Sequence, residues 1–325
     1  MIVDLPDTTV SNISKTLVKI REEGGAVALG RVLTLIIATH LGQEEEAIEA
    51  ANDASREHPM RVIVVSTEEE RSHKADANDG EGRLDAQIRV GGDAGASEVI
   101  VLRAYGETAS DEEGLVTGLL LPDAPVVVWW PGIAPAKVSH SPLGRIATRR
   151  ITDASAQPNP QEALYHLAET YAPGDTDFAW TRLTLWRAQL AAVLDQPPYE
   201  PITAVEVAGA ADSPSTLLLA AWLRLQLQVP VQYDLASRAV GSGGIHGVRM
   251  ERASGTIELE REVPNVARLS QPGQPSHDLA LPRRSLRDCL AEELRRLDPD
   301  DLYGEVITHG LGLLETADEG AGARA

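Results

Sequence analysis

Cysteine, phenylalanine and long apolar runs are nearly absent from this sequence. The single cysteine, Cys289, excludes an intramolecular disulfide and any Cys-x-x-Cys redox or metal motif. No apolar run is long enough to cross a bilayer, and no basic segment leading into an apolar one marks secretion. We therefore expect a reducing, cytoplasmic location and no membrane partner.

Basic residues are too few to balance the acidic ones. The chain of 325 residues has 29 Lys and Arg against 49 Asp and Glu, which gives a formal net charge of -20. A surface of this charge repels nucleic-acid backbones, so we expect no nucleic-acid partner. The chain is longer than most single cores, and its 43% of hydrophobic residues can fill two domains.

The sequence does contain a regular alternation of apolar strands and helices. Residues 31–42 and 60–67 are β-branched, apolar runs typical of buried strands, and Pro59 stops the helix between them. This β-α-β order implies parallel strands joined by a helical crossover. Residues 97–130 repeat the order of strand, helix and strand. Residues 83–92 alternate polar and apolar side chains, which predicts a half-exposed edge strand.

The second half of the chain repeats this order and then departs from it. A helix start is expected at Asn159, and residues 202–234 form a second β-α-β pattern in which Ser213 is the predicted helix N-cap. Residues 244–273 alternate between turn signals, which predicts antiparallel strands. Residues 285–315 have the periodicity of helices.

The predicted fold class is α/β, with two domains of mainly parallel or mixed sheets flanked by helices and an antiparallel region added to the second. The predicted limits are residues 1–158 for the N-terminal domain and residues 159–316 for the C-terminal domain. A disordered tail is expected at residues 317–325. Residues 68–82 are too polar to be buried and are expected to form a mobile loop.

Motifs for catalysis, cofactors and metals are missing. Neither GxGxxG nor GxxxxGKS/T follows a strand, and the glycine-rich stretches 91–95 and 241–244 open no Leu-rich helix, so we interpret both as loops. There is no HExxH or GxSxG, and the histidines are dispersed. Cys289 falls on the apolar face of a helix, as a buried structural cysteine does. We predict no catalytic residue, no bound cofactor and no metal ion.

The segment PVVVWWPG, residues 125–132, places two tryptophans at the end of a strand. Because neighbouring strand residues face opposite sides, Trp129 and Trp130 cannot both line one pocket. The stretch 124–152 contains no Asp or Glu. It is either a surface loop whose bases pair with acids elsewhere, or a site for an anion or acidic partner at the carboxyl end of a parallel strand. Its basic residues are Lys137, Arg145, Arg149 and Arg150.

A second aromatic segment, DFAWTRLTLWR, covers residues 177–187. Trp186 lies on the apolar stripe of a helix and is expected in the core. Trp180 flanks that stripe, close to Asp177 and Arg182, and Trp and Arg are residues that protein interfaces favour. Packing within the core, or between domains, is the alternative for each tryptophan.

These segments resemble the OpcA family of glucose-6-phosphate dehydrogenase assembly proteins, in the form found in actinobacteria. The resemblance runs from about residue 30 to residue 297, and the WWPG and DFAWTRLTLWR segments carry most of it. It implies a two-domain, non-catalytic partner of the dehydrogenase. Relatives in cyanobacteria are associated with redox control through cysteines, which a lone Cys289 cannot supply as an internal disulfide. The positions that match are structural or interface candidates: Trp129, Trp130, Pro131, Asp177, Trp180, Thr181, Arg182 and Trp186.

The hypothesis from the sequence is therefore an assembly or activating subunit of glucose-6-phosphate dehydrogenase, which supports NADP-linked oxidation of glucose 6-phosphate in the pentose phosphate pathway. The alternative is an enzyme or sensor that binds a sugar phosphate, a nucleotide or another anionic metabolite through Arg149 and Arg150. A scaffold without regulatory effect is a third hypothesis. Self-association and the docking surface are left open.

Overall fold

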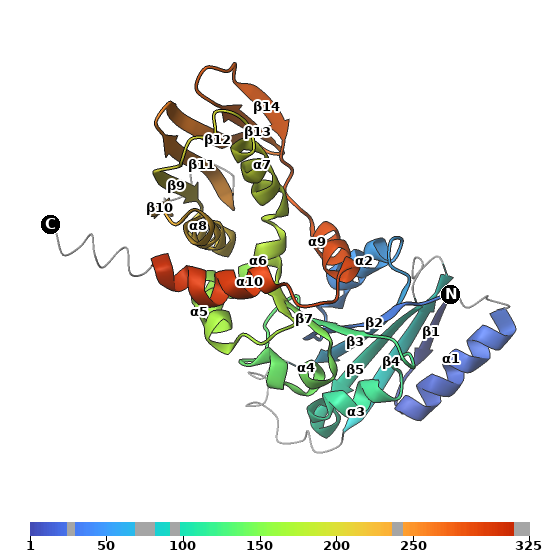
Figure 1. Ribbon diagram of the computed structural model, residues 1–325. Helices are drawn as coiled ribbons and strands as arrows, with labels where there is room; N and C mark the ends of the chain where they lie inside the picture. Colours follow the sequence, from blue (N-terminus) through green and yellow to red (C-terminus); the bar gives the residue numbers. More distant parts are fainter. Residues whose placement is uncertain (25–29, 69–81, 92–97, 236–242, 315–325) are drawn as a thin grey trace. The chain divides into compact units, whose positions relative to one another are not determined.

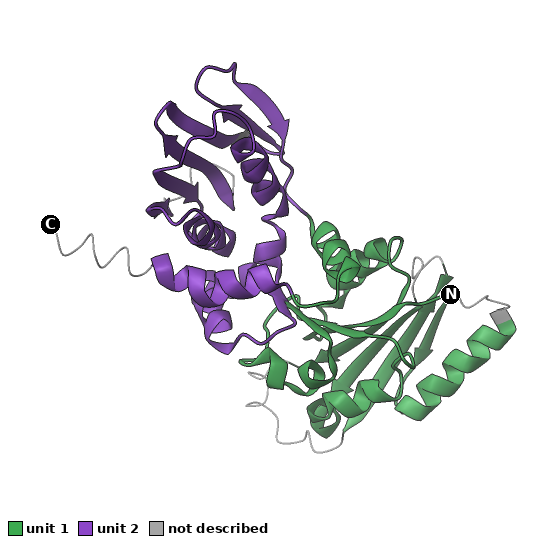
Figure 2. Ribbon diagram, viewed as in Figure 1, with its two compact units in different colours: residues 1–152, 285–299 green, residues 153–284, 300–325 purple. Residues whose placement is uncertain are grey.

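The chain is described by a computed structural model that covers residues 1–24, 30–68, 82–91, 98–235 and 243–314 (Figure 1). It forms two compact units (Figure 2): residues 1–152 with 285–299 make unit 1, and residues 153–284 with 300–325 make unit 2. The predicted mobile loop, apart from its two end residues, and the predicted tail at 317–325 lie outside the described residues.

Unit 1 contains a mostly parallel sheet. Its strands lie in the order β1-β4-β5-β3-β2-β6-β7, in which β5, β3, β2, β6 and β7 run parallel to one another. Strand β4 pairs antiparallel with β5, and β1 pairs antiparallel with β4. The parallel strands form from the apolar runs that the sequence predicted. The strands are β1 (Ile2–Leu5), β2 (Leu33–His40), β3 (Met60–Thr67), β4 (Arg83–Val90), β5 (Glu98–Tyr105), β6 (Val126–Trp129) and β7 (Arg149–Thr152).

Helices lie on both faces of this sheet (Figure 1). One face is covered by α1 (Val10–Gly24), α3 (Glu112–Thr117) and α4 (Pro142–Ile146), which bury Ile13, Leu115 and Leu143 against it. On the other face, α2 (Glu44–Ala54) lies beside α9 (Leu286–Arg295), and His58 Nε2 is 3.1 Å from Ala291 O. Helix α9 therefore belongs to unit 1, although the residues on both sides of the segment 285–299 belong to unit 2.

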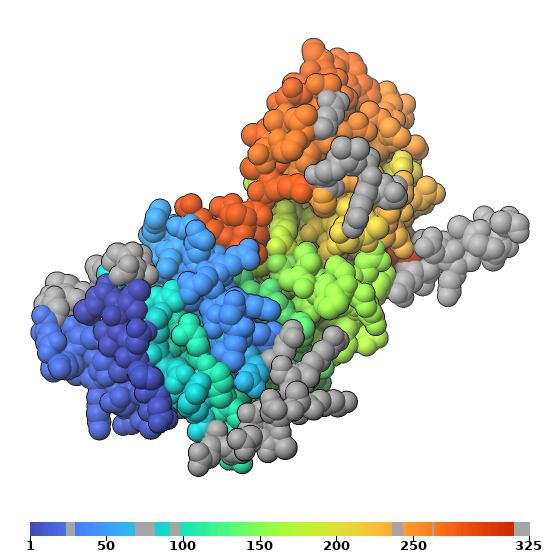
Figure 3. Space-filling model, turned by 180° about the vertical axis from the view of Figure 1, so that it is seen from behind, coloured from blue at the N-terminus to red at the C-terminus, as the bar shows by residue number. Residues whose placement is uncertain are grey.

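The edge of the sheet is β1 and not β4, so the prediction of an edge strand at residues 83–92 was wrong. Val3 pairs with Ile88, and Met1 N donates to Val90 O at 2.9 Å. Strand β1 has only four residues, half of them exposed, so no alternating pattern marks it in the sequence. Figure 3 shows these N-terminal residues in dark blue on the surface.

A buried cluster of charges lies at the amino ends of β3 and β5. Glu98 is 2% exposed, and its carboxylate forms ion pairs with three guanidinium groups. The N···O distances are 3.0 Å to Arg21, 2.8 Å to Arg31 and 2.8 Å to Arg61. Burial lowers the pKa of Arg61, and the charge of Glu98 opposes that effect. One carboxylate thus neutralises part of the charge of three arginines inside the unit.

Unit 2 contains a mixed sheet in the order β10-β9-β11-β12-β13-β14. Strands β9 and β10 pair in parallel and are joined by α8, as the second β-α-β pattern predicted. Every other pair of neighbouring strands in this sheet is antiparallel. The strands of this sheet are β9 (Ala204–Gly209), β10 (Val231–Asp234), β11 (Ile245–Arg252), β12 (Gly255–Val263), β13 (Val266–Ser270) and β14 (His277–Ala280). Unit 2 also contains the short strand β8 (Asp175–Asp177), which does not belong to this sheet. The helices are α5 (Pro160–Thr170), α6 (Phe178–Thr181), α7 (Thr184–Leu194), α8 (Pro214–Leu227) and α10 (Asp301–Glu305), which continues into a π-helical turn (Val306–Gly310).

One face of this second sheet is apolar and the other is polar. Val207, Met250 and Leu259 belong to the same buried cluster as Trp186 of α7 and Leu218 of α8. The opposite face carries ion pairs between neighbouring strands, such as that of Arg249 with Glu258. The helical cover therefore lies on one side, and the fold class is α/β with two mixed sheets, as predicted.

Candidate functional site

The crevice of unit 1 lies where the order of its parallel strands reverses. The chain moves from β2 to β3 on one side and returns to β6 on the other side of β2, and open α/β sheets bind ligands outside the carboxyl ends of such strands. A cavity of about 400 Å³ occupies this place. It is lined by Thr39, Gly42, Gln43, Glu45, Glu46, Ala47, Pro131, Gly132 and Leu286.

The charge of this crevice is negative. Three glutamates fill the first turn of α2, the position where a dinucleotide fold presents free backbone N–H groups to a pyrophosphate. Arg89 donates to both carboxylate oxygens of Glu45, at 2.6 and 2.9 Å, and these hydrogen bonds hold the pKa of Glu45 below its usual value. An ionised carboxylate at the helix N-terminus disfavours phosphate there, and Arg89 compensates the charge of Glu45.

Trp129 and Trp130 are both buried at the end of β6, and they face different sides. Trp130 shares a hydrophobic cluster with Val126 and Val128, and Trp129 does not belong to that cluster. The exposed fraction is 0% for Trp129 and 4% for Trp130. The two indoles thus anchor the end of the strand, and the first exposed apolar side chain that follows them is Ile133.

The three arginines of the acid-free stretch donate hydrogen bonds to residues of different parts of unit 1. Arg145 is exposed and donates to Glu113 at 3.0 Å. Arg149 is buried, and it donates to Glu293 at 2.9 Å and to the carbonyl of Asp298 at 2.8 Å. Arg150 is also buried, and one of its nitrogens donates to the carbonyl of Ala147 at 3.2 Å. Arg149 therefore ties β7 to α9.

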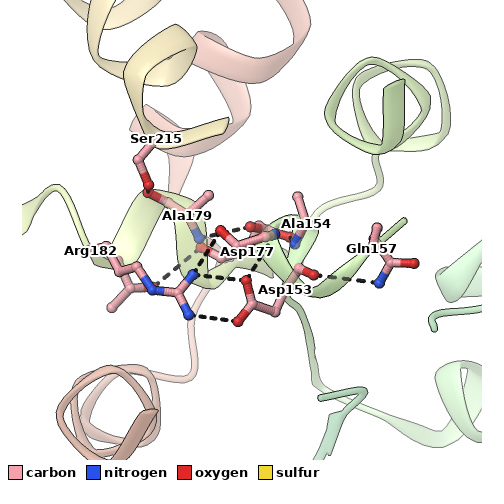
Figure 4. A network of polar contacts seen from close by, with 9 residues as sticks. Asp153, Ala154, Gln157, Asp177, Ala179, Arg182 and Ser215 are labelled. Carbon is pink, nitrogen blue, oxygen red and sulfur yellow. Dashed lines mark hydrogen bonds and ion pairs between the residues drawn. The ribbon is translucent and has the colours of Figure 1, made fainter. Parts of the chain in front are cut away.

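Asp177 and Arg182 of unit 2 belong to one polar network (Figure 4). The carboxylate of Asp177 accepts the backbone N–H of Ala179 at 2.7 Å, which caps α6, and that of Ala154 at 2.9 Å. Arg182 binds Asp153 with two parallel hydrogen bonds of 2.8 and 2.6 Å. The two side chains hold the start of unit 2 against α6, which gives this part of the aromatic segment a structural role.

Trp180 is a buried residue of the same segment. Its indole Nε1 donates to Asp300 at 2.9 Å, the guanidinium of Arg187 lies 3.7 Å from the ring centroid, and the ring of Tyr303 is 5.8 Å away. Trp186 is 2% exposed and belongs to the core, as predicted. The sequence indicated neither Asp153 nor Asp300 as partners, because both lie far along the chain from the residues that they bind.

Replacing Asp177 by Asn is expected to destabilise unit 2 by about 1–3 kcal/mol, because an amide has one acceptor oxygen where the carboxylate accepts two backbone N–H groups. Guanidinium chloride unfolding with hydrogen exchange of the unit 2 amides measures the change. Asp195→Asn at the exposed end of α7 is the control, for which a change below about 0.5 kcal/mol is expected. Equal stability of the two variants would contradict the role of Asp177.

The described residues contain neither a metal site nor a helix that could span a membrane. No group of three or more His, Cys, Asp and Glu there has the arrangement needed to hold a metal ion. In the same ranges no helix has both the length and the apolar character that a bilayer crossing requires. Cys289 is buried in α9.

The strand order and the crevice define the class of fold: an open-sheet α/β protein in which carboxylates occupy the helix start after β2. Two family models match this chain. The model for the N-terminal domain of a glucose-6-phosphate dehydrogenase subunit matches residues 51–169, and the model for the C-terminal domain of such a subunit matches residues 173–307. The chain belongs to the OpcA family.

Individual proteins give further likenesses. An OxPP cycle protein OpcA of Synechocystis sp. is 31% identical over 103 residues, which cover 31% of this chain and 22% of that protein, so the match spans about a fifth of the relative's length. An oxidoreductase from Sinorhizobium meliloti has a TM-score of 0.47 at 10% identity, over 89% of this chain and 98% of its own. Myo-inositol dehydrogenase from Lactobacillus casei has a TM-score of 0.42 at 10% identity, over 88% of this chain and 95% of its own.

Proposed function

We propose that this chain is a non-catalytic subunit that binds glucose-6-phosphate dehydrogenase and supports its assembly or activity. The observation that carries the proposal is the pair of family matches, which together extend from residue 51 to residue 307 and are both described as domains of a subunit of that enzyme. A subunit that changes the dehydrogenase must bind one of its conformations or oligomers more tightly than another.

The acidic crevice supports a role other than dinucleotide binding. In an enzyme that used a nicotinamide cofactor here, the first turn of α2 would meet the pyrophosphate, and in this chain that turn carries Glu44, Glu45 and Glu46. The carboxylate of Glu44 already accepts hydrogen bonds from the hydroxyl of Ser66 at 2.8 Å and from Nε of Arg103 at 3.3 Å. NADP would then belong to the partner enzyme.

The docking surface that we propose is the loop after β6. Ile133 is 54% exposed, lies directly after the WWPG residues, and is followed by the exposed Lys137 in a stretch without carboxylates. The buried Trp129 and Trp130 hold the start of this loop, so the tryptophans would act through it rather than by touching the partner. An apolar centre with a basic neighbour suits an apolar patch edged by acidic groups.

Size-exclusion chromatography with light scattering tests this proposal, using the purified chain and the dehydrogenase of the same organism. A complex with a mass equal to a whole-number combination of the two chains is expected. Ile133→Asp is expected to weaken the complex at least about ten-fold, because it places an unpaired charge in the buried centre. The matched control is Val18→Asp on α1, where an apolar residue of similar exposure lies far along the chain. Equal weakening by both variants would contradict the docking loop, and absence of any complex would contradict the proposed function.

A further inference from the structure

A cavity of about 350 Å³ in unit 2 has a basic lining, although the chain as a whole is strongly acidic. Its size falls in the range of pockets for small organic ligands. Four arginines line it against one aspartate, and Figure 4 shows two of its lining residues, Arg182 and Ser215. The charged and hydroxyl-bearing residues of the lining are Ser155, Arg182, Asp212, Ser213, Ser215, Arg261, Arg283 and Arg284.

Two of the four arginines have a clear structural task. Arg182 holds Asp153, and Arg284 donates to the carbonyl of Thr181 at 3.0 Å. Arg261 and Arg283 differ, because neither side chain forms an ion pair with a carboxylate among the described residues. Two guanidinium groups thus share one cavity, and neither has an ion pair in the part of the chain that the structure describes.

Arg261 is held at the apolar face of the sheet. It follows Ile257 and Leu259 at alternate positions of β12, and its guanidinium carbon is 5.1 Å from the ring centroid of Trp186. One terminal nitrogen donates to the carbonyl of Leu281 at 2.7 Å, and the Nε atom is buried without a hydrogen-bond partner in the described part of the chain. Burial first, and then the nearby charge of Arg283, lower the pKa of Arg261 to about 10. Holding a cation in this place destabilises the free protein, and a bound anion would reverse that effect.

The start of α8 adds neutral donors to the same cavity. The sequence predicts Ser213 as the N-cap of this helix, but its hydroxyl makes no capping hydrogen bond, although the residue is only 5% exposed. Ser213 and Ser215, at the N-terminal end of this 14-residue helix, line the cavity, so the positive end of the helix dipole lies there. Gly243 and Gly244 lie at the cavity, and no atom lies within 4 Å of a Cβ built on either of them, so there is room beside the backbone.

We infer that this cavity binds a small phosphate monoester, with Arg261, Arg283 and the hydroxyl of Ser213 donating to the phosphate oxygens. A dianionic phosphate matches two guanidinium groups that have no carboxylate partner among the described residues, together with a helix N-terminus. A free phosphate ion would leave most of the volume unfilled. The remaining wall offers Pro282 as an apolar surface and the carboxylate of Asp212 as an acceptor for a hydroxyl group, which favours a phosphorylated polyol or sugar.

Isothermal titration calorimetry on the full chain alone tests this inference, so its result does not depend on the dehydrogenase. The probes are glucose 6-phosphate, inorganic phosphate and glucose. Saturable binding of glucose 6-phosphate at least about ten-fold tighter than that of inorganic phosphate is expected, with none for glucose. Binding of neither phosphate up to about 10 mM would overturn the inference, and equal affinity for the two would overturn the assignment of an ester.

Variants locate the binding. Arg283→Gln changes an exposed side chain that should not affect folding, and it is expected to weaken glucose 6-phosphate at least about ten-fold, as is Arg261→Gln. The matched control is Arg249→Gln on the polar face of the same sheet, which removes an equal charge and should change affinity less than about two-fold. Equal weakening by all three variants, or by none, would place the anion elsewhere and overturn the site.

Discussion

Replacing Glu98 by Gln is expected to lower the free energy of unfolding of unit 1 by about 3–5 kcal/mol. Glu98 is the carboxylate that Arg21, Arg31 and Arg61 share, and the substitution leaves all three without that charge while the volume is kept. Arg61 bears most of the cost, because its side chain is 6% exposed, whereas that of Arg21 is 36% exposed and can turn to water.

Guanidinium chloride unfolding measures this change, and hydrogen exchange of the β3 and β5 amides assigns it to unit 1. Glu23→Gln on α1 is the control, because the ion pair of Glu23 with Lys19 is exposed and is expected to contribute less than about 1 kcal/mol. A loss for Glu98→Gln as small as that of the control would mean that the three arginines find sufficient solvation without the carboxylate.

A second large change in the free energy of unfolding is expected when the ion pair of Arg149 and Glu293 is broken. Their side chains are 4% and 6% exposed, and Arg149 also binds the carbonyl of Asp298, so removing either charge takes a counter-charge away from a buried ionised group. Arg149→Met and Glu293→Met are each expected to cost about 3–5 kcal/mol. The double variant, which replaces the pair by two apolar side chains, is expected to cost at least about 2 kcal/mol less than the sum of the two singles.

A double-mutant cycle by denaturant unfolding measures that coupling. The comparison pair is Arg268 and Asp278, which are 3.1 Å apart but 47% and 58% exposed, and its coupling should stay below about 1 kcal/mol. Additive losses for Arg149 and Glu293 would show that the two side chains stabilise unit 1 independently of each other. Arg149 would then remain available for another charge, as the anion-binding alternative requires.

Much of the fold could be predicted from the sequence, because buried parallel strands consist of continuous β-branched runs. Strand β3 has the predicted limits of Met60 to Thr67, and the parallel pair β9 and β10 follows from its β-α-β pattern. Two features could not be predicted in this way. Strand β1 is too short and too exposed to show a period, and the periodicity of α9 indicates which face is apolar but not that this face packs beside α2.

The candidate site was harder to predict than the fold, because its interactions join residues that are distant in the chain. The acid-free stretch around Arg149 suggested uncompensated charge, yet its carboxylate partner lies 144 residues away. Ser213 has the residue type and position of an N-cap, and only the structure shows that its hydroxyl is not used as one. Arg261 and Arg283 come from a strand and from the segment after β14, so no local motif marks the cavity that they share.

If both proposals hold, the two units have different functions. Unit 1 carries the docking loop after β6, and unit 2 carries a cavity for a phosphate monoester. A ligand of unit 2 can alter the binding of the dehydrogenase only if its affinity differs between the free chain and the chain in the complex. Comparing the affinity for glucose 6-phosphate with and without the dehydrogenase would measure that coupling, once the enzyme's own binding of the sugar phosphate is subtracted.

The most direct test of the central claim is a titration of this chain into a fixed amount of the dehydrogenase from the same organism, with the rate of glucose 6-phosphate-dependent NADP reduction as the readout. The account predicts a rate that changes with added chain and saturates at a fixed ratio of the two proteins, with no NADP reduction by the chain alone. An unchanged rate at concentrations up to about 10 µM, together with the absence of a complex, would contradict it.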